Sequence, residues 1–483
     1  MVDLRAIFFI IGAMLIGITA IMLIPIVYEF FHGKPGVWQQ FMLPFFITGG
    51  VGALFTLTNY RKKQIKLGIR EAFLLTFFSW IVCCFFSSLT IYWPSRECTL
   101  INALFESVSA LTTTGFSTIS NLEVMPRGIV LWRAILQWLG GIGIIVMAIT
   151  IFPVLRIGGM QLFRSEFSDR SEKILPRVSQ IAAGILCAYT LFTLIGYVGL
   201  IFCGLGSFDA ICHAASAIST GGLSTHTNGI IDFDNPAAEV VLMIMMIIGG
   251  STLLLYIRLW KGDYKGVFHD QQLRGYLKVI GFACTFASIC LIIHGMPALA
   301  SIRRGCFVAI STITTTGFVL FNYMDFGSAL ITTIFLFSFI GGCTGSTTGG
   351  IKIFRFQVIG SFIRNHIKQL RRPHGVFVPM FQGQKISDQL VSSIFTFVGL
   401  YLLLIAVLAI LLSMTGLDFV SAISGAVAAI SNVGSGLGNV LGPVSNIDQI
   451  STFAKVLLMM GMILGRLELL TVLVLLSAGF WRR

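Results

Sequence analysis

Four short segments rich in Ser, Thr and Gly recur along this chain, and they constrain its fold more than any other feature. They contain the sequences FESVSALTTTGFST, CHAASAISTGGLST, FVAISTITTTGFVL and AVAAISNVGSGL. Each combines an apolar stretch too short to cross a bilayer with a Thr/Gly run, between two long apolar segments. A single copy is typical of a turn or a helix-packing surface, but four copies in register indicate an internal repeat. The aligned glycines are Gly115, Gly222, Gly317 and Gly434.

The long apolar segments predict an all-α polytopic membrane protein. Hydrophobic residues make up 56% of the 483 residues and charged residues only 11%, which excludes a soluble multidomain protein. The apolar runs also leave no length for a soluble catalytic domain. Ten spanning helices are expected, at 6–31, 38–59, 72–93, 129–155, 180–204, 238–257, 279–300, 328–343, 390–414 and 453–480.

The positive charge of the chain follows its expected topology. A net charge of +13 suggests nucleic acid as a partner, but the Lys and Arg residues gather in alternate loops. The positive-inside rule then places both termini and four basic loops in the cytoplasm, and no nucleic-acid partner is expected. Together with Arg5, Arg482 and Arg483, these loops hold 25 of the 33 Lys and Arg residues. The loop residues are Arg61, Lys62, Lys63, Lys66, Arg70; Arg156, Arg164, Arg170, Lys173, Arg177; Arg258, Lys261, Lys265, Arg274, Lys278; and Lys352, Arg355, Arg364, Lys368, Arg371, Arg372, Lys385.

The repeat divides the chain into five parts. Residues 1–70 form an amino-terminal pair of spanning helices that stands outside the repeat. Each later part is a spanning helix, a short pore helix, a Thr/Gly segment and a second spanning helix. These four pore repeats are predicted at 71–178, 179–278, 279–385 and 386–483.

Four Thr/Gly segments at one membrane depth predict a central pore. Irregular backbone is tolerated there only where protein buries it or where it lines a watery cavity. Glycine can turn its carbonyl toward the axis, so four segments make rings of oxygen dipoles that select cations. The short helices, for example Ala103 to Leu111 and Ile302 to Ile313, would aim their partially negative ends at the cavity. The candidate filter residues are Thr113, Thr114, Gly115, Thr220, Gly221, Gly222, Thr315, Thr316, Gly317, Asn432, Val433 and Gly434.

A few polar residues near these segments have two interpretations. Glu106 and Asp209 either add negative potential at the pore mouth or bond helix ends and loops. His213 and His226 flank the second segment without a partner at ligand spacing, which favours hydrogen-bonded structural histidines. The ten cysteines lack a Cys-x-x-Cys motif and are expected to be apolar packing. No bound cofactor is expected.

The sequence motifs resemble the TrkH branch of the Trk/Ktr/HKT potassium-transport superfamily over essentially the whole chain. The motifs are TTTGFST at 112–118, STGGLST at 219–225, TTTGF at 314–318, IGGCTGSTTGGIK at 340–352, NVGSGLG at 432–438 and GRLELLTVL at 465–473. The resemblance implies four covalently joined repeats, each built like a potassium-channel subunit, with two extra amino-terminal helices. Serine at the first filter position goes with sodium preference in plant relatives, so four glycines imply potassium as the transported ion.

A glycine-rich break and a membrane-embedded arginine suggest a gate below the filter. The 328–343 segment ends in a run of Gly, Ser and Thr that is too polar to continue as a buried helix, and the resemblance implies an intramembrane gating loop there. Arg466 costs at least ~2.5 to 3.5 kcal/mol inside the membrane unless it faces water or a partner, and it either closes the gate or only caps loop carbonyls. Relatives often have glycine or alanine where Thr344 and Thr348 stand. The candidate gate residues are Gly341, Gly342, Gly345, Ser346, Thr347, Gly349, Gly350 and Arg466.

These features predict potassium uptake across a bacterial inner membrane by a protein that is not an enzyme. The alternative is a secondary transporter that couples a small cation to H⁺ or Na⁺, but inverted repeats are disfavoured because all four Thr/Gly segments fall on one face. An intramembrane enzyme is disfavoured because the spans carry no nucleophile with a base and no His-Glu metal motif.

The resemblance also implies a homodimer and a cytosolic RCK-type (TrkA-like) nucleotide-binding subunit. That subunit would dock on the basic loops around 156–178, 258–278 and 352–385. The alternative is that these charges only set topology or meet anionic lipid headgroups.

Overall fold

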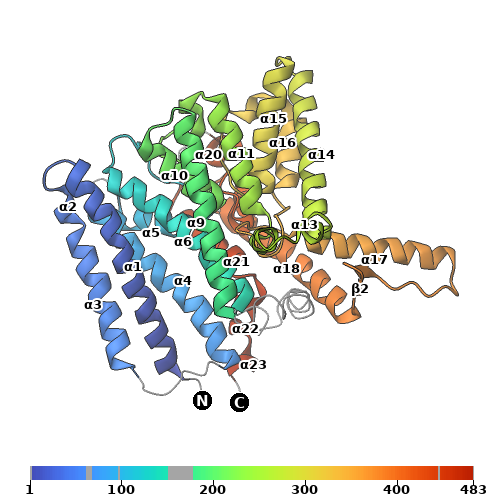
Figure 1. The fold of residues 1–483 in the computed structure, drawn as a ribbon, viewed down its shortest axis with the longest axis horizontal. Helices are drawn as coiled ribbons and strands as arrows, with labels where there is room; N and C mark the ends of the chain where they lie inside the picture. The colour runs from blue at the N-terminus through green and yellow to red at the C-terminus, as the bar shows by residue number, and fades with distance from the viewer. Residues whose placement is uncertain (1–2, 61–67, 96–97, 151–177, 444–446, 482–483) are drawn as a thin grey trace.

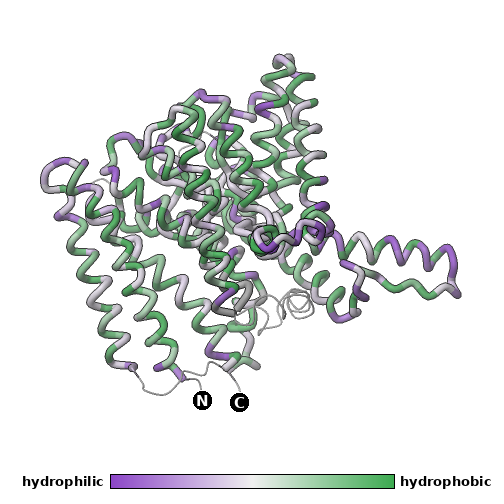
Figure 2. Tube along the Cα trace, viewed as in Figure 1, coloured by the Kyte–Doolittle hydropathy of each residue, from purple (hydrophilic) through white to green (hydrophobic). Residues whose placement is uncertain are grey.

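The structure, a computed structural model, is a helical membrane protein whose described residues are 3–60, 68–95, 98–150, 178–443 and 447–481. In these ranges seven helices are long and apolar enough to cross a membrane, or eight if one bent pair is a single span. Apolar residues follow the helices throughout the bundle (Figure 2). The described strands are the two-residue pair β1 (Met380–Phe381) and β2 (Gln384–Lys385). The predicted all-α polytopic fold class is confirmed.

The amino-terminal helices pack as an antiparallel pair at one edge of the bundle (Figure 1). They are α1 (Leu4–His32) and α3 (Met42–Thr58), joined through the short α2 (Val37–Gln40). Their backbones approach closely at Gly12 and Gly52, where a Cβ on Gly12 would lie 2.8 Å from the Gly52 carbonyl oxygen. Small residues therefore allow this contact, as in other membrane helix pairs.

The rest of the bundle repeats a long helix followed by a short one. The long helices are α4 (Ile69–Tyr92), α9 (Val178–Phe202), α14 (Gln271–Ile293) and α18 (Asp388–Ser413). The short helices that follow them are α5 (Leu100–Leu111), α10 (Ser207–Ile218), α15 (Ala298–Ile313) and α19 (Phe419–Ser431). With 12 to 16 residues, the short helices cannot span a bilayer, and their carboxyl ends are buried in the centre of the protein.

The second helix of the later repeats is broken, and only one of the three breaks was predicted. The segments 238–257 and 453–480 were each expected to be one span, whereas 328–343 was expected to end in a glycine-rich loop. In the structure α11 (Pro236–Gly250) and α12 (Leu253–Trp260) meet at 93°, whereas α6 (Arg127–Thr150) continues unbroken. The helix α16 (Gly327–Phe337) gives way to a buried loop before α17 (Ile353–Arg371), and α21 (Thr452–Arg466) is followed by α22 (Leu470–Leu476) and α23 (Ala478–Trp481). Window-averaged hydropathy does not register such breaks because most residues around them are apolar or small, and a single charge such as Glu468 is averaged out.

Two further features orient the molecule. One apolar cluster contains Ile7 of α1, Phe73 of α4 and Phe480 of α23. The start of α1 and the last described helix, α23, therefore lie at the same face (Figure 1). The helix α17 and the β1–β2 hairpin project away from the bundle as an arm (Figure 1).

The remaining described elements are short. They are η1 (Gly229–Phe233), α13 (Tyr264–Phe268), η2 (Tyr323–Asp325), α20 (Gly438–Leu441) and η3 (Ile447–Gln449).

Candidate functional site

Each short helix ends in the same turn. In the first repeat the Thr113 N–H donates to the Ala110 carbonyl (3.0 Å) and the Thr114 N–H donates to the Ser109 carbonyl (2.8 Å). This pair of bonds is a Schellman motif, which requires a residue in the left-handed conformation. The same two bonds recur after α10, α15 and α19, and the left-handed residues are Thr113, Thr220, Thr315 and Asn432, with φ of 52° to 55°.

Three of these four left-handed residues are threonines. A β-branched residue is unfavourable at positive φ, by about 1–2 kcal/mol, whereas asparagine tolerates this conformation. The fourth repeat has Asn432, whose Nδ2 donates to Thr114 Oγ1 and to the Met462 carbonyl (2.9 Å each). The same strained conformation occurs at Thr113, Thr220 and Thr315, which indicates that the surrounding structure stabilises it because the site requires it.

The four Thr/Gly segments form a closed ring, which we call the glycine ring. A Cβ atom on Gly115 would lie 2.4 Å from the Gly221 carbonyl oxygen, and one on Gly222 would lie 1.9 Å from that of Thr316. The series continues from Gly317 to Val433 and closes from Gly434 to Thr114, at 1.8 Å each. All four glycines have positive φ, of 75° to 95°. The structure therefore brings all twelve predicted filter residues together, and each glycine leaves room for the carbonyl of its neighbour.

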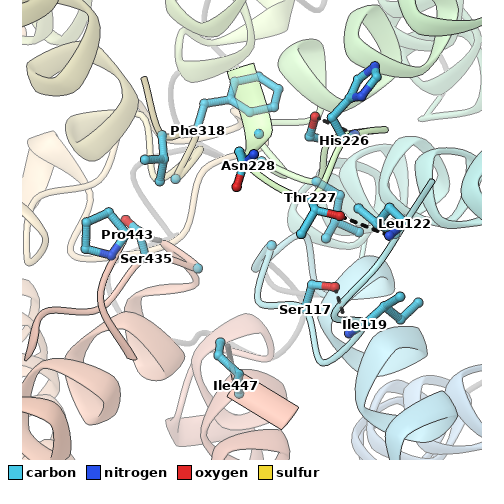
Figure 3. A pocket seen from close by; sticks show the side chains of 18 of the residues that line it. Ser117, Ile119, Leu122, His226, Thr227, Asn228, Phe318, Ser435, Pro443 and Ile447 are labelled. Atoms are coloured by element: carbon cyan, nitrogen blue, oxygen red, sulfur yellow. Dashed lines mark hydrogen bonds between the residues drawn. The ribbon is translucent and has the colours of Figure 1, made fainter. Parts of the chain in front are cut away.

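A polar cavity opens on one side of the glycine ring. Its volume is about 170 Å³ and all four ring glycines line it. Figure 3 shows that its wall is built from the loops that follow the short helices, and Ser117, Thr227, Phe318 and Ser435 contribute to that wall from different segments. We call this space the outer cavity.

Two acidic residues, the buried Glu106 and the partly buried Asp209, form hydrogen bonds to the loops on this side of the ring. Glu106 of α5 pairs with Arg133 of α6 at 2.7 Å and accepts a hydrogen bond from the Ser117 hydroxyl at 2.9 Å. Asp209 accepts a bond from Thr225 Oγ1 at 2.6 Å, and His213 bridges the Asp209 carbonyl and Ser224 Oγ. Of the two interpretations given for these acids, the loop-bonding one matches these contacts, and His213 is a structural histidine as predicted.

On the opposite side, a buried loop from Ser338 to Lys352 lies directly beneath the ring. Gly349 N–H donates to Thr315 Oγ1 (2.8 Å), and Thr347 Oγ1 lies 2.9 Å from Thr220 Oγ1. A Cβ on Gly349 would also lie 2.1 Å from the Ser431 carbonyl oxygen. The loop, which we call the inner loop, thus touches three of the four ring segments.

The inner loop is ordered by its own hydrogen bonds. Gly341 N–H donates to the Ile351 carbonyl (2.9 Å), which pins the two ends of the loop together. Thr348 Oγ1 accepts from Gly342 N–H and lies 2.8 Å from Ser346 Oγ. Thr348, where relatives often have glycine or alanine, therefore connects several residues of the loop through its hydroxyl. All seven loop residues that were predicted for the gate lie in the inner loop. They are Gly341, Gly342, Gly345, Ser346, Thr347, Gly349 and Gly350.

Arg466 contacts the inner loop from the end of α21. Its Nη1 donates to the Thr347 carbonyl (2.8 Å) and its Nη2 to the Gly140 carbonyl of α6 (3.3 Å). The side chain is 3% exposed. The sequence interpretation placed Arg466 in the middle of one helix, but the helix ends there and Glu468 adopts positive φ of 52°.

Three charged residues near Arg466 were missed or misplaced by the sequence interpretation. Lys352 and Arg355 were counted in a cytoplasmic loop, but they are 8% and 0% exposed. Arg355 Nη2 lies 2.6 Å from Glu468 Oε2, and its guanidinium lies 3.7 Å from the centre of the Phe397 ring. Lys352 Nζ donates to the carbonyl and the hydroxyl of Thr348. Lys352 and Arg355 directly follow the glycine run and precede the polar part of α17, and this position in the sequence could have indicated that they are buried.

These residues enclose a small cavity below the inner loop, and we call them the inner charge cluster. The cavity has a volume of about 30 Å³. Its lining includes three cations, Lys352, Arg355 and Arg466, and among its described residues Glu468 is the only carboxylate.

Comparison with known proteins identifies the family. The model of the TrkH family, described as "Cation transport protein", matches residues 37–482. The chain belongs to the TrkH family. It is 40% identical over 417 residues to the Trk system potassium uptake protein TrkI of Halomonas elongata, covering 86% of this chain and 84% of that protein. It is 33% identical to the Trk system potassium uptake protein TrkH of Escherichia coli, covering 99% of each.

A solved structure supports the same assignment. The crystal structure of the potassium transporter TrkH from Vibrio parahaemolyticus matches with a TM-score of 0.90 at 30% identity. The match covers 99% of this chain and 100% of that one. The chain is therefore a multi-pass membrane protein of a cation-transport family.

Proposed function

We propose that this protein takes up potassium through the glycine ring. The observation that carries the proposal is the closed series of ring contacts, in which each glycine packs against the carbonyl of the next segment. Rings of backbone carbonyls replace the hydration shell of a cation. Relatives that match nearly the full length of the chain are named potassium uptake proteins, which supports potassium as the ion. Glycine at all four positions is consistent with that choice.

Ion flux into proteoliposomes tests this proposal. Potassium and rubidium should enter faster than sodium and lithium, because rings of carbonyl oxygens of the potassium-channel type replace the hydration shell of the larger ions. The same assay with an imposed pH or sodium gradient separates passive conduction from coupling to H⁺ or Na⁺. Equal flux of all four ions contradicts a carbonyl filter, and accumulation of potassium against its gradient supports the coupled alternative.

We further propose that the inner loop and Arg466 form a closed gate. The support is their position, since the loop contacts three ring segments and Arg466 holds the Thr347 carbonyl beneath them. A fixed cation on the ion path repels potassium, by several kcal/mol at low effective dielectric. Opening then requires the loop and the guanidinium to move away from the axis.

Three variants separate a gate from a structural role. Arg466→Ala, Arg466→Lys and a shortened inner loop are measured for flux per folded molecule, with Lys34→Ala as the control for loss of an exposed charge. A gate predicts faster basal flux for Arg466→Ala and the shortened loop. Lower folded yield with unchanged flux per molecule supports a purely structural arginine instead.

The remaining proposals concern topology and partners. The common face of α1 and α23 and the basic loops support cytoplasmic termini in a bacterial inner membrane, with a division into the pair 1–70 and four repeats. We expect no enzymatic activity. A homodimer and an RCK-type (TrkA-like) cytosolic subunit are proposed from the family membership.

We propose a smaller docking surface on this protein for that subunit than the basic loops alone suggested. Lys352 and Arg355 are buried, so the exposed basic residues of α17, such as Arg364 and Lys368, are the better candidates. The loop around 156–178 lies outside the described residues except for its last residue. Co-purification with the cytosolic subunit, before and after Arg364→Ala and Lys368→Ala, tests the assignment. Binding that is unchanged by both substitutions excludes this part of α17.

A further inference from the structure

Three metal-ligating side chains gather at the rim of the outer cavity. Glu123 comes from the loop after the first ring segment, His226 from the loop after the second, and Asp232 from the short helix η1 that follows His226. One donor atom from each lies within 4.8 Å of the other two. His226 also lines the outer cavity (Figure 3). The proposed transport mechanism uses none of these side chains, and the sequence interpretation treated His226 as structural.

Hydrogen bonds already position the two carboxylates. Thr227 donates to Glu123 from its backbone N–H (3.0 Å) and its hydroxyl (2.6 Å). Asn228 Nδ2 donates to Asp232 Oδ1 at 3.0 Å. Partial burial acts to raise the pKa of Glu123, but the two bonds from Thr227, with smaller contributions from the Glu123 backbone and from His226, together lower it below its ordinary value. Glu123 is therefore ionised and oriented at neutral pH.

The imidazole of His226 lies between carboxylates with both nitrogens accessible to them. Nδ1 is 3.7 Å from Glu123 Oε1, and Nε2 is 3.8 Å from Asp209 Oδ1. The ring packs edge-on against Phe233, with centroids 4.9 Å apart. The side chain is 34% exposed and that of Glu123 is 46% exposed, so an ion in solution can reach both.

One imidazole and two carboxylates match the ligand preference of zinc-like ions. Zn²⁺ binds nitrogen and carboxylate oxygen at ~2.0–2.2 Å and commonly takes three protein ligands plus water. Imidazole nitrogen favours Zn²⁺, Ni²⁺ and Cu²⁺ over Mg²⁺ and Ca²⁺, which prefer oxygen alone. The donor atoms, which all lie within 4.8 Å of one another, must move closer together to reach this geometry, and the two carboxylates are on exposed side chains that can change rotamer.

We propose that Glu123, His226 and Asp232 bind a divalent transition-metal ion of the Zn²⁺ type, and that the bound ion slows access of cations to the outer cavity. The bound ion neutralises the two carboxylates near the cavity that His226 lines, and so removes their attraction for an approaching monovalent cation. The proposed metal binding depends on the ligand geometry alone. The proposed inhibition of transport also rests on the proposed potassium uptake.

Direct binding of Zn²⁺ tests the first half. Tag-free, full-length protein in detergent is titrated with Zn²⁺ by calorimetry and with Co²⁺ by absorption spectroscopy, which reports tetrahedral coordination. We expect one ion per chain, with affinity lower by about tenfold or more in His226→Asn, Glu123→Gln and Asp232→Asn. His294→Asn, which changes a histidine at the end of α14, is the matched control and should bind as the parent does. No binding, or equal affinity in all variants, overturns the proposal.

Flux in the presence of external Zn²⁺ tests the second half. Each variant is normalised to its own metal-free potassium flux, so that any change in basal transport cancels. External Zn²⁺ should slow the parent and the His294→Asn control, and should have little effect on His226→Asn at the same concentration, while Mg²⁺ should slow none of them. Inhibition that persists in His226→Asn, or binding without inhibition, overturns the inhibitory role. A parent without any potassium flux contradicts the proposed function instead, because the binding measurement remains independent of it.

Discussion

The glycine ring and the inner charge cluster both place irregular backbone inside the protein, but different interactions stabilise the backbone in the two regions. In the ring, the same Schellman turn occurs four times and the contacts are between glycines and carbonyls. In the cluster, one carboxylate and three cations hold a loop that occurs once. The ring therefore depends on backbone shape, and the cluster depends on buried charge. Substitutions that change only one of these properties should affect the two regions differently.

The largest expected effect is from adding a methyl group to the ring. Gly434→Ala and Gly317→Ala each place a Cβ 1.8 Å from a neighbouring carbonyl oxygen, at positive φ. Backbone cannot yield as a flexible side chain does, so we expect loss of potassium flux and of folded yield. Gly399→Ala on α18, where a Cβ meets nothing within 4 Å, is the control. Normal flux in both ring variants shows that the ring is not the ion path.

The next largest effect should come from neutralising the only described carboxylate of the inner cavity. Glu468→Gln removes the 2.6 Å partner of the buried Arg355, and breaking a buried pair costs about 3–5 kcal/mol. Thermal unfolding in detergent measures this loss. Glu239→Gln is the matched comparison because its partner, Arg303, is 24% exposed and remains partly solvated. An equal fall in melting temperature for both variants contradicts a special role of the inner charge cluster.

A milder effect is expected at Gly115, where the ring is least crowded. A Cβ there lies 2.4 Å from the Gly221 carbonyl, compared with 1.8–1.9 Å at the other three positions. Gly115→Ser should therefore retain flux but weaken the discrimination of potassium from sodium, because one carbonyl is displaced. Gly434→Ser should abolish flux. Competition of sodium with rubidium uptake measures the difference, and unchanged selectivity with full flux removes Gly115 from the filter.

The smallest effect should come from exchanging left-handed residues between repeats. Thr113→Asn relieves a strained β-branched residue and should raise stability by up to about 1 kcal/mol. The reciprocal Asn432→Thr adds strain and removes two hydrogen bonds, so its melting temperature should fall. Opposite shifts support a ring determined by backbone conformation. Shifts of the same sign indicate that side-chain packing around these residues matters more.

The sequence predicted the ring well because repetition made it visible. Glycines that align in four copies identify a backbone requirement without knowledge of any contact, and all four lie in the ring. The inner charge cluster occurs once, so no internal comparison was available. Arg466 was found because its charge is costly in an apolar run, but Lys352 and Arg355 resembled topology signals until their burial was known. The pairing of Arg355 with Glu468 depends on a helix break that hydropathy does not encode.

The placement of Arg466 and Glu468 near the carboxyl terminus has a consequence for how the chain is made. Arg355, Thr347 and Gly140 are synthesised first, whereas their charged partners arrive only with the last helices, because synthesis runs from the amino terminus. A nascent chain that stops before residue 466 carries Lys352 and Arg355 into the membrane without Glu468. The Arg355–Glu468 ion pair therefore forms only after the last helices are synthesised, although Arg355 is made more than a hundred residues earlier.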